Sequence, residues 1–173
     1  RINTVSPSYA AEIKTPYFAE GLEGIPDGVS CACSVAEGAE FEVASGLVCV
    51  GSFAATGMVS VAEGAVLRIA GGTAEFRSGV QGVGAVEIAG DGTLFAANGP
   101  LSMPRLNLLE GAAISVEMTD GVTSFLTSAA PVVLPESWNL HVDASRLTER
   151  TTATLLRAPS ISGSVDQWTL VVD

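Results

Sequence analysis

The sequence predicts an all-β fold, a β-solenoid in which short strands stack coil upon coil. The first observation is an eleven-residue row that recurs five times, at residues 33–43, 59–69, 86–96, 106–116 and 132–142. The second is the alternation of apolar and polar residues within each row, which is the period-two pattern of strands. The third is a small-residue corner in mid-row, such as AEGA, where glycine lets the backbone turn sharply.

Positions one, three, nine and eleven of each row are apolar, and we expect them to face the core. Position three is occupied in turn by Val35, Val61, Ile88, Leu108 and Leu134. The spacing of these positions falls in the range of structural repeats, so each repeat is interpreted as one coil of about 20–27 residues. Between the rows lie four third-strand candidates, 47–50, 73–76, 124–127 and 154–157, so three strands per coil is the simplest arrangement.

The two ends of the chain differ from the repeats. Residues 1–30 contain prolines and aromatic residues without a clear period, and we interpret them as an amino-terminal cap or arm that could pair with a neighbouring subunit. Residues 31–143 form the solenoid repeats, and 144–173 supply closing strands and a carboxy-terminal cap. Trp138 and Trp168 are expected to plug the carboxy-terminal end of the core.

Composition narrows the function classes. The chain has 173 residues and a net charge of −11, which argues against nucleic acid because phosphate backbones bind clustered Lys and Arg. No apolar stretch is long enough to predict a membrane-spanning segment. The richness in Gly, Ala, Val, Ser and Thr fits an exported β protein, secreted or displayed on a cell surface.

Three cysteines, Cys31, Cys33 and Cys49, leave at least one thiol outside any disulfide within the monomer. Cys33 lies at an inward position and is expected to act as a small buried hydrophobe. A disulfide from Cys49 to Cys31 or Cys33 is the alternative. Metal binding is disfavoured because no fourth soft ligand or nearby histidine accompanies them.

Two segments carry a resemblance to a known family. LRIAGGTAEFRSGVQGVGAVEIAGDGTLFAANG, at 67–99, resembles the autotransporter-associated β-strand repeats of bacterial passenger domains, and ATLLRAPSISGSVDQWTLVVD, at 153–173, resembles the ends of related secreted proteins. The resemblance implies a right-handed parallel β-helix with capped ends outside a bacterial cell. An antiparallel sandwich or jelly roll is the alternative fold, but it does not by itself explain columns that agree position by position.

Catalytic motifs are absent from the sequence, including GxSxG, the Walker phosphate loop, HExxH and paired CxxC. His141 is the single histidine, and Asp143 would share its face of a strand; an exposed surface histidine is the simpler interpretation. Lys14 is the sole lysine and lies outside the repeats, which disfavours polysaccharide cleavage by carboxylates and bases on one face. We therefore expect a non-enzymatic protein.

Two features suggest ligands. If the rows stack in register, Glu37, Glu63, Asp91 and Glu110 form a column of acids that could bind calcium as a cofactor; a solvated acidic edge is the alternative. Phe95 is expected on the outward face of the third row, where it could stack on a sugar ring.

The function predicted from these features is a structural or adhesive extracellular β-solenoid of a bacterial surface, which could assemble into a fibre. Its partners would be other copies of the chain, or a glycan or protein of the host or matrix. The alternative is a carbohydrate-binding or accessory domain of a larger secreted protein.

Overall fold

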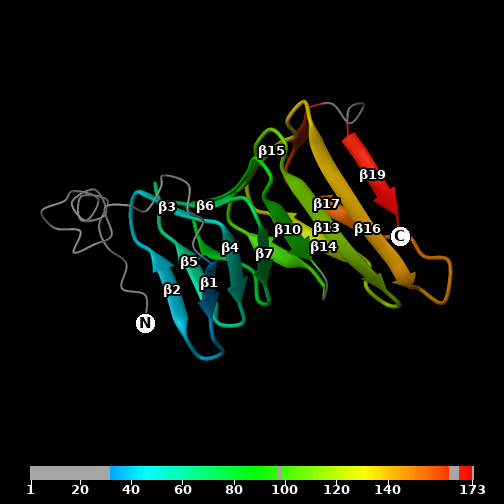
Figure 1. Ribbon diagram of the computed structural model, residues 1–173, viewed down its shortest axis with the longest axis horizontal. Coiled ribbons are helices and arrows are strands. Elements are labelled where there is room, and N and C mark those ends of the chain that lie inside the picture. The colour runs from blue at the N-terminus through cyan, green and yellow to red at the C-terminus, as the bar shows by residue number, and fades with distance from the viewer. Residues whose placement is uncertain (1–31, 97–98, 164–167, 173) are drawn as a thin grey trace, which may run out of the picture. The chain divides into compact units, whose positions relative to one another are not determined.

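The computed structural model describes residues 32–96, 99–163 and 168–172, so the predicted arm at 1–30 lies outside the described residues. Strands are the only regular elements in the described ranges, and every strand pairing among them is parallel. The predicted fold class, an all-β parallel β-helix, is therefore confirmed. Figure 1 shows its strands lying side by side.

The strands are short, as expected for chain segments that turn a corner every few residues. In chain order they are β1 (Ala32–Val35), β2 (Glu40–Val43), β3 (Leu47–Val50), β4 (Ser52–Ala55), β5 (Met58–Val61), β6 (Val66–Ala70), β7 (Thr73–Phe76), β8 (Gln81–Gly82), β9 (Ala85–Ala89), β10 (Thr93–Ala96), β11 (Leu101–Met103), β12 (Leu106–Leu108), β13 (Ala113–Thr119), β14 (Ser124–Ser128), β15 (Val132–Val133), β16 (Trp138–Arg146), β17 (Thr154–Arg157), β18 (Ile161–Ser162) and β19 (Trp168–Val172). Three of the four predicted third strands have these bounds, and the fourth ends one position later than predicted.

The strands form three faces, because each coil gives one strand to each face. The first face is one sheet in the order β1-β4-β7-β10-β13-β16-β19, and Figure 1 shows these strands side by side. The second face is β2-β5-β8 followed by β11-β14-β17. The third is β3-β6-β9-β12 followed by β15-β18. The predicted closing segment extends all three faces, since β17, β18 and β19 pair with β14, β15 and β16, the strands one coil earlier.

The coils lengthen along the chain. The length of a coil is the sequence separation between paired residues on the first face. Ala32 pairs with Ser52 in the next coil, and Thr93 pairs with Ala113 at the same separation. The next two coils are longer, as the pairing of Ala113 with Asn139 and of Trp138 with Trp168 shows. The long strands β13 and β16 take up part of this extra length.

The expected register of the first rows was wrong. Val35 does not stack on Val61; it pairs with Ala55, while Val61 pairs with Val43. Each row crosses one corner of the three-sided coil, and the first two rows cross different corners, β1 to β2 and β5 to β6. The step from Val35 to Val61 is therefore more than one coil. From Ile88 to Leu108 the rows do stack as predicted.

The core consists of the predicted inward columns. Leu67, Ile69, Ile88 and Leu94 have no exposed surface, and the other inward positions of the five rows are buried or half-buried. Phe53 packs between two further phenylalanines, with ring centroids 5.3 Å from those of Phe41 and of Phe76. Trp138 is buried as predicted, and its strand partner is Trp168.

Two glycines show what the corners and the stacking require. Gly64, in the AEGA corner between β5 and β6, has a φ of 73°, the left-handed region that side chains disfavour. Gly82 has a φ of 98°, and a Cβ added there would lie 2.1 Å from the carbonyl oxygen of Val61 in the neighbouring coil. Glycine is thus required at Gly82 for both its conformation and the close approach of two coils.

Candidate functional site

The predicted calcium ligands lie at three different corners of the coil. Glu37 follows β1 and Glu63 follows β5, whereas Asp91 and Glu110 both lie at corners that lead onto the first face. The structure therefore brings Asp91 and Glu110 to one edge and leaves Glu37 and Glu63 apart from them. In the described ranges no group of three or more His, Cys, Asp or Glu side chains could hold a metal ion.

Glu110 instead joins two coils. Its Oε1 accepts a hydrogen bond from the backbone N–H of Glu136 at 3.0 Å, and its Oε2 accepts from the N–H and the hydroxyl of Ser137 at 3.0 and 2.6 Å. The Ser137 hydroxyl, followed by the two N–H groups, holds the pKa of Glu110 below its ordinary value. The carboxylate thus satisfies backbone donors at the next corner.

A second carboxylate acts in the same way further along the chain. Asp120 accepts hydrogen bonds from the hydroxyl and the N–H of Thr148, which lower the pKa of the Asp120 carboxyl. An ion pair of 2.7 Å also joins Glu117 to Arg146 on the first face. Acidic side chains therefore link the longer coils near the carboxy-terminal end of the solenoid.

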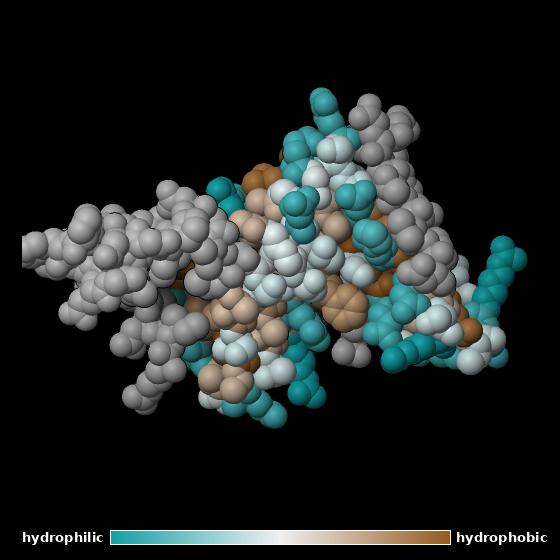
Figure 2. Space-filling view, in the orientation of Figure 1, coloured by the Kyte–Doolittle hydropathy of each residue, from teal (hydrophilic) through white to brown (hydrophobic). Residues whose placement is uncertain are grey.

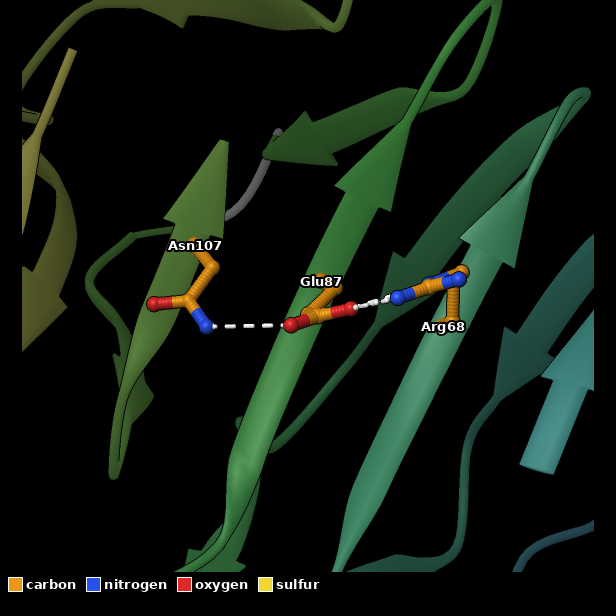
Figure 3. Close-up of polar contacts among 3 residues, drawn as sticks. All are labelled: Arg68, Glu87 and Asn107. Carbon is orange, nitrogen blue, oxygen red and sulfur yellow. Dashed lines mark hydrogen bonds and ion pairs between the residues drawn. The ribbon is translucent and has the colours of Figure 1, made fainter. Parts of the chain in front are cut away.

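A polar ladder, formed by Arg68, Glu87 and Asn107, crosses three coils on the third face (Figure 3). The residues come from β6, β9 and β12 and are in register. Arg68 Nε donates to Glu87 Oε2 at 2.9 Å, its Nη2 lies 2.7 Å from the same oxygen, and Asn107 Nδ2 donates to Glu87 Oε1 at 3.2 Å. Both carboxylate oxygens of Glu87 are thus bound by neighbouring coils, and the side chain is only 14% exposed.

His141 and Asp143 lie on β16 with the alternation that was predicted. His141 is exposed, and its side chain has no hydrogen bond or ion pair to the described part of the chain. Asp143 accepts a hydrogen bond from the N–H of Ser145 at 2.9 Å, and interactions with Ser145 lower the pKa of Asp143. The Asp143 carboxylate is thus oriented by its own strand and not by the histidine.

Cys33 and Cys49 occupy two different faces. Cys33 is buried on β1, as expected for an inward position, and Cys49 is exposed on β3. Because these strands belong to different sheets, and one side chain is buried while the other is exposed, no disulfide joins Cys33 to Cys49. Cys31, the other predicted partner, lies outside the described residues.

Phe95 borders a hollow of about 350 Å³ on the outside of the solenoid. Its strand partner is Glu75 on β7, and Arg77 follows two positions later on the same outward side. The remaining lining residues come from β4, from the end of β7, from the start of β11 and from the segments next to β4 and β11: Ala54, Ala55, Thr56, Phe76, Gly99, Pro100 and Leu101. The sequence interpretation placed Phe95 on the surface but did not single out Glu75 or Arg77, whose outward positions follow from the alternation in TAEFR.

The described surface seen in Figure 2 is mixed in character. Polar and weakly polar residues cover much of it, and apolar residues form smaller patches between them. Large apolar side chains with substantial exposure are Leu47, Met58, Val83, Leu109, Val133 and Ile161.

Comparison of the chain with protein-family models, with curated proteins and with solved structures finds no match. Over the described ranges, no helix is long and apolar enough to cross a membrane.

Proposed function

We propose that the chain is a non-enzymatic, extracellular β-solenoid that serves as a structural or adhesive scaffold on a bacterial surface. The observation that carries this proposal is that outward polar side chains form hydrogen bonds between successive coils. Glu87, Glu110 and Asp120 each bind groups of a neighbouring coil. Polar contacts of this kind tie successive coils together and favour a rigid rod over independently moving repeats.

Assembly into a fibre fits the open ends of such a rod. Among the described strands, β17, β18 and β19 each have one edge that pairs with no other strand. The first and last coils of a parallel solenoid present complementary edges, so one copy of the chain can add head to tail onto another. Such a heterologous contact does not close on itself and produces filaments. The occupant we propose is therefore a second copy of the same chain.

Ile161 offers a direct test of this contact. It lies on the edge strand β18 and is 46% exposed. A lysine there would put a charge at the contact between two copies. The matched control is Val83→Lys, which adds the same charge at a residue that is 64% exposed, between β8 and β9 and away from the end of the stack.

The measurement is electron microscopy and sedimentation velocity over a concentration range. We expect the wild-type chain and Val83→Lys to form filaments that lengthen with concentration, and Ile161→Lys to stay monomeric. Single particles of the wild-type chain at every concentration would contradict self-assembly.

A carbohydrate-binding or accessory domain of a larger secreted protein is the second candidate. The hollow beside Phe95 favours it, because it combines an aromatic ring with two charged side chains in a concave surface. This candidate and the scaffold are compatible, since the hollow is lined by β4, β7, β10 and β11 and not by β17, β18 or β19 at the end of the stack.

A further inference from the structure

We propose that the hollow beside Phe95 binds one neutral pyranose unit of a glycan, with the Phe95 ring against the face of the sugar and with Glu75 and Arg77 on its hydroxyl groups. The inference rests on the second candidate function and assigns its site and ligand class. It does not depend on filament formation.

The strand register brings the three side chains together. Phe95 of β10 pairs with Glu75 of β7, so the two side chains are neighbours on the outward side of the first face. Phe76 points inward and is 3% exposed, which places Arg77 outward again beside Glu75. The backbone N–H of Arg77 donates to Ala55 O at 2.9 Å, so the base of this arginine is fixed by the coil below.

Glu75 and Arg77 differ from the two ion pairs described above, because within the described part of the chain neither side chain has a partner. Arg68 and Glu87 form an ion pair, whereas neither Glu75 nor Arg77 has a side-chain hydrogen bond or ion pair to any described residue. Both side chains are exposed, and no described residue engages their charged groups. The hydroxyl of Thr56, at the wall of the hollow, donates to Val35 O at 3.1 Å, which leaves its oxygen to accept a further hydrogen bond.

A neutral sugar matches these groups. A pyranose has one apolar face that packs on an aromatic ring, and its hydroxyls both donate to a carboxylate and accept from a guanidinium. The charges of Glu75 and Arg77 offset each other, and the net charge of −11 on the chain disfavours acidic sugars. The volume of about 350 Å³ is at the lower end of the range for ligand sites, which suits a single sugar unit.

The test is saturation-transfer NMR on the full chain with three neutral probes: methyl β-D-glucopyranoside, methyl β-D-galactopyranoside and methyl α-D-mannopyranoside. We expect saturation transfer to at least one probe. Phe95→Ala should weaken its binding by about tenfold or more, and Glu75→Gln and Arg77→Gln by about three- to tenfold each. His141→Ala is the matched control, because His141 is exposed on the same face and, two strands along, in the same register as Phe95. It should bind like the wild type.

Equal urea midpoints for the variants and the wild type establish that any loss of binding is local. Binding that survives all three substitutions in the hollow would overturn this inference while leaving the second candidate function in place. No binding of any neutral probe would overturn both. Binding of methyl β-D-glucuronide in preference to the neutral probes would overturn the assignment of a neutral ligand.

Discussion

The replacement of Ile88 by alanine tests the stacked core. Ile88 has no exposed surface and lies in register between Ile69 in one coil and Leu108 in the next. The change removes three buried carbon atoms, for which the transfer free energy is about 2.4 kcal/mol at ~0.8 kcal/mol per methylene. Because neighbours in stacked coils cannot collapse into the space, a cavity adds to this loss. We expect Ile88→Ala to lower the free energy of unfolding by about 3–4 kcal/mol.

The assay is equilibrium urea unfolding followed by circular dichroism. Ile161→Ala is the control, because it removes the same atoms from an isoleucine that is 46% exposed at the edge of the last coil. Its cost should be about 1 kcal/mol or less. The reasoning is refuted if Ile88→Ala costs less than ~1 kcal/mol, or if both substitutions cost the same.

Two further predictions concern a close contact and a carboxylate. Gly82→Ala places a Cβ 2.1 Å from Val61 O and should destabilise the chain by ~2 kcal/mol or more in the same assay, whereas Gly38→Ala, with a similar φ of 76° but no atom within 4 Å, should cost only ~1 kcal/mol; equal costs would contradict the close approach. The pKa of Glu110 is lowered by its bonds to Ser137 and the next corner, so its stabilising effect is present above the ordinary carboxyl pKa and is lost as the pH falls through the folded value. The urea midpoint of Glu110→Gln should consequently fall less between pH 7 and pH 3 than that of the wild type; identical pH profiles would contradict the assigned role.

The strands and their inward faces could be predicted because alternation is a local property. In the row around Val59, Val61, Leu67 and Ile69, each apolar residue alternates with one that faces outward, and all four are buried. In a strand with one buried face, only one of the two alternating sets of residues can face the core, since a shift by a single position would turn every apolar side chain to solvent.

The register between coils could not be predicted because similar corners recur around the coil. The sequence AEGA occurs after both Val35 and Val61, yet one corner joins the first face to the second and the other joins the second to the third. Both corners need the same left-handed glycine, so row similarity alone does not distinguish a full coil from a longer step.

The uncertain register between coils also limited the prediction of functional residues. The calcium hypothesis needed Glu37 and Glu63 in one column, and the true register separates them. Conversely, Phe95 was predicted on the outward face, but Glu75 lies one coil earlier in the chain and becomes its neighbour only once the strands are paired.

Disulfide trapping of the register tests the three-sided stack most directly. In a chain with Cys31, Cys33 and Cys49 replaced, one variant carries cysteines at Ser34 and Ala54, which are strand partners on the first face. Adjacent residues on paired strands lie within the Cα separation that a disulfide requires. A second variant carries them at Ser34 and Ser60, which lie on different faces. We predict rapid oxidation within the monomer for the first pair and none for the second; the reverse result would contradict the stack described above.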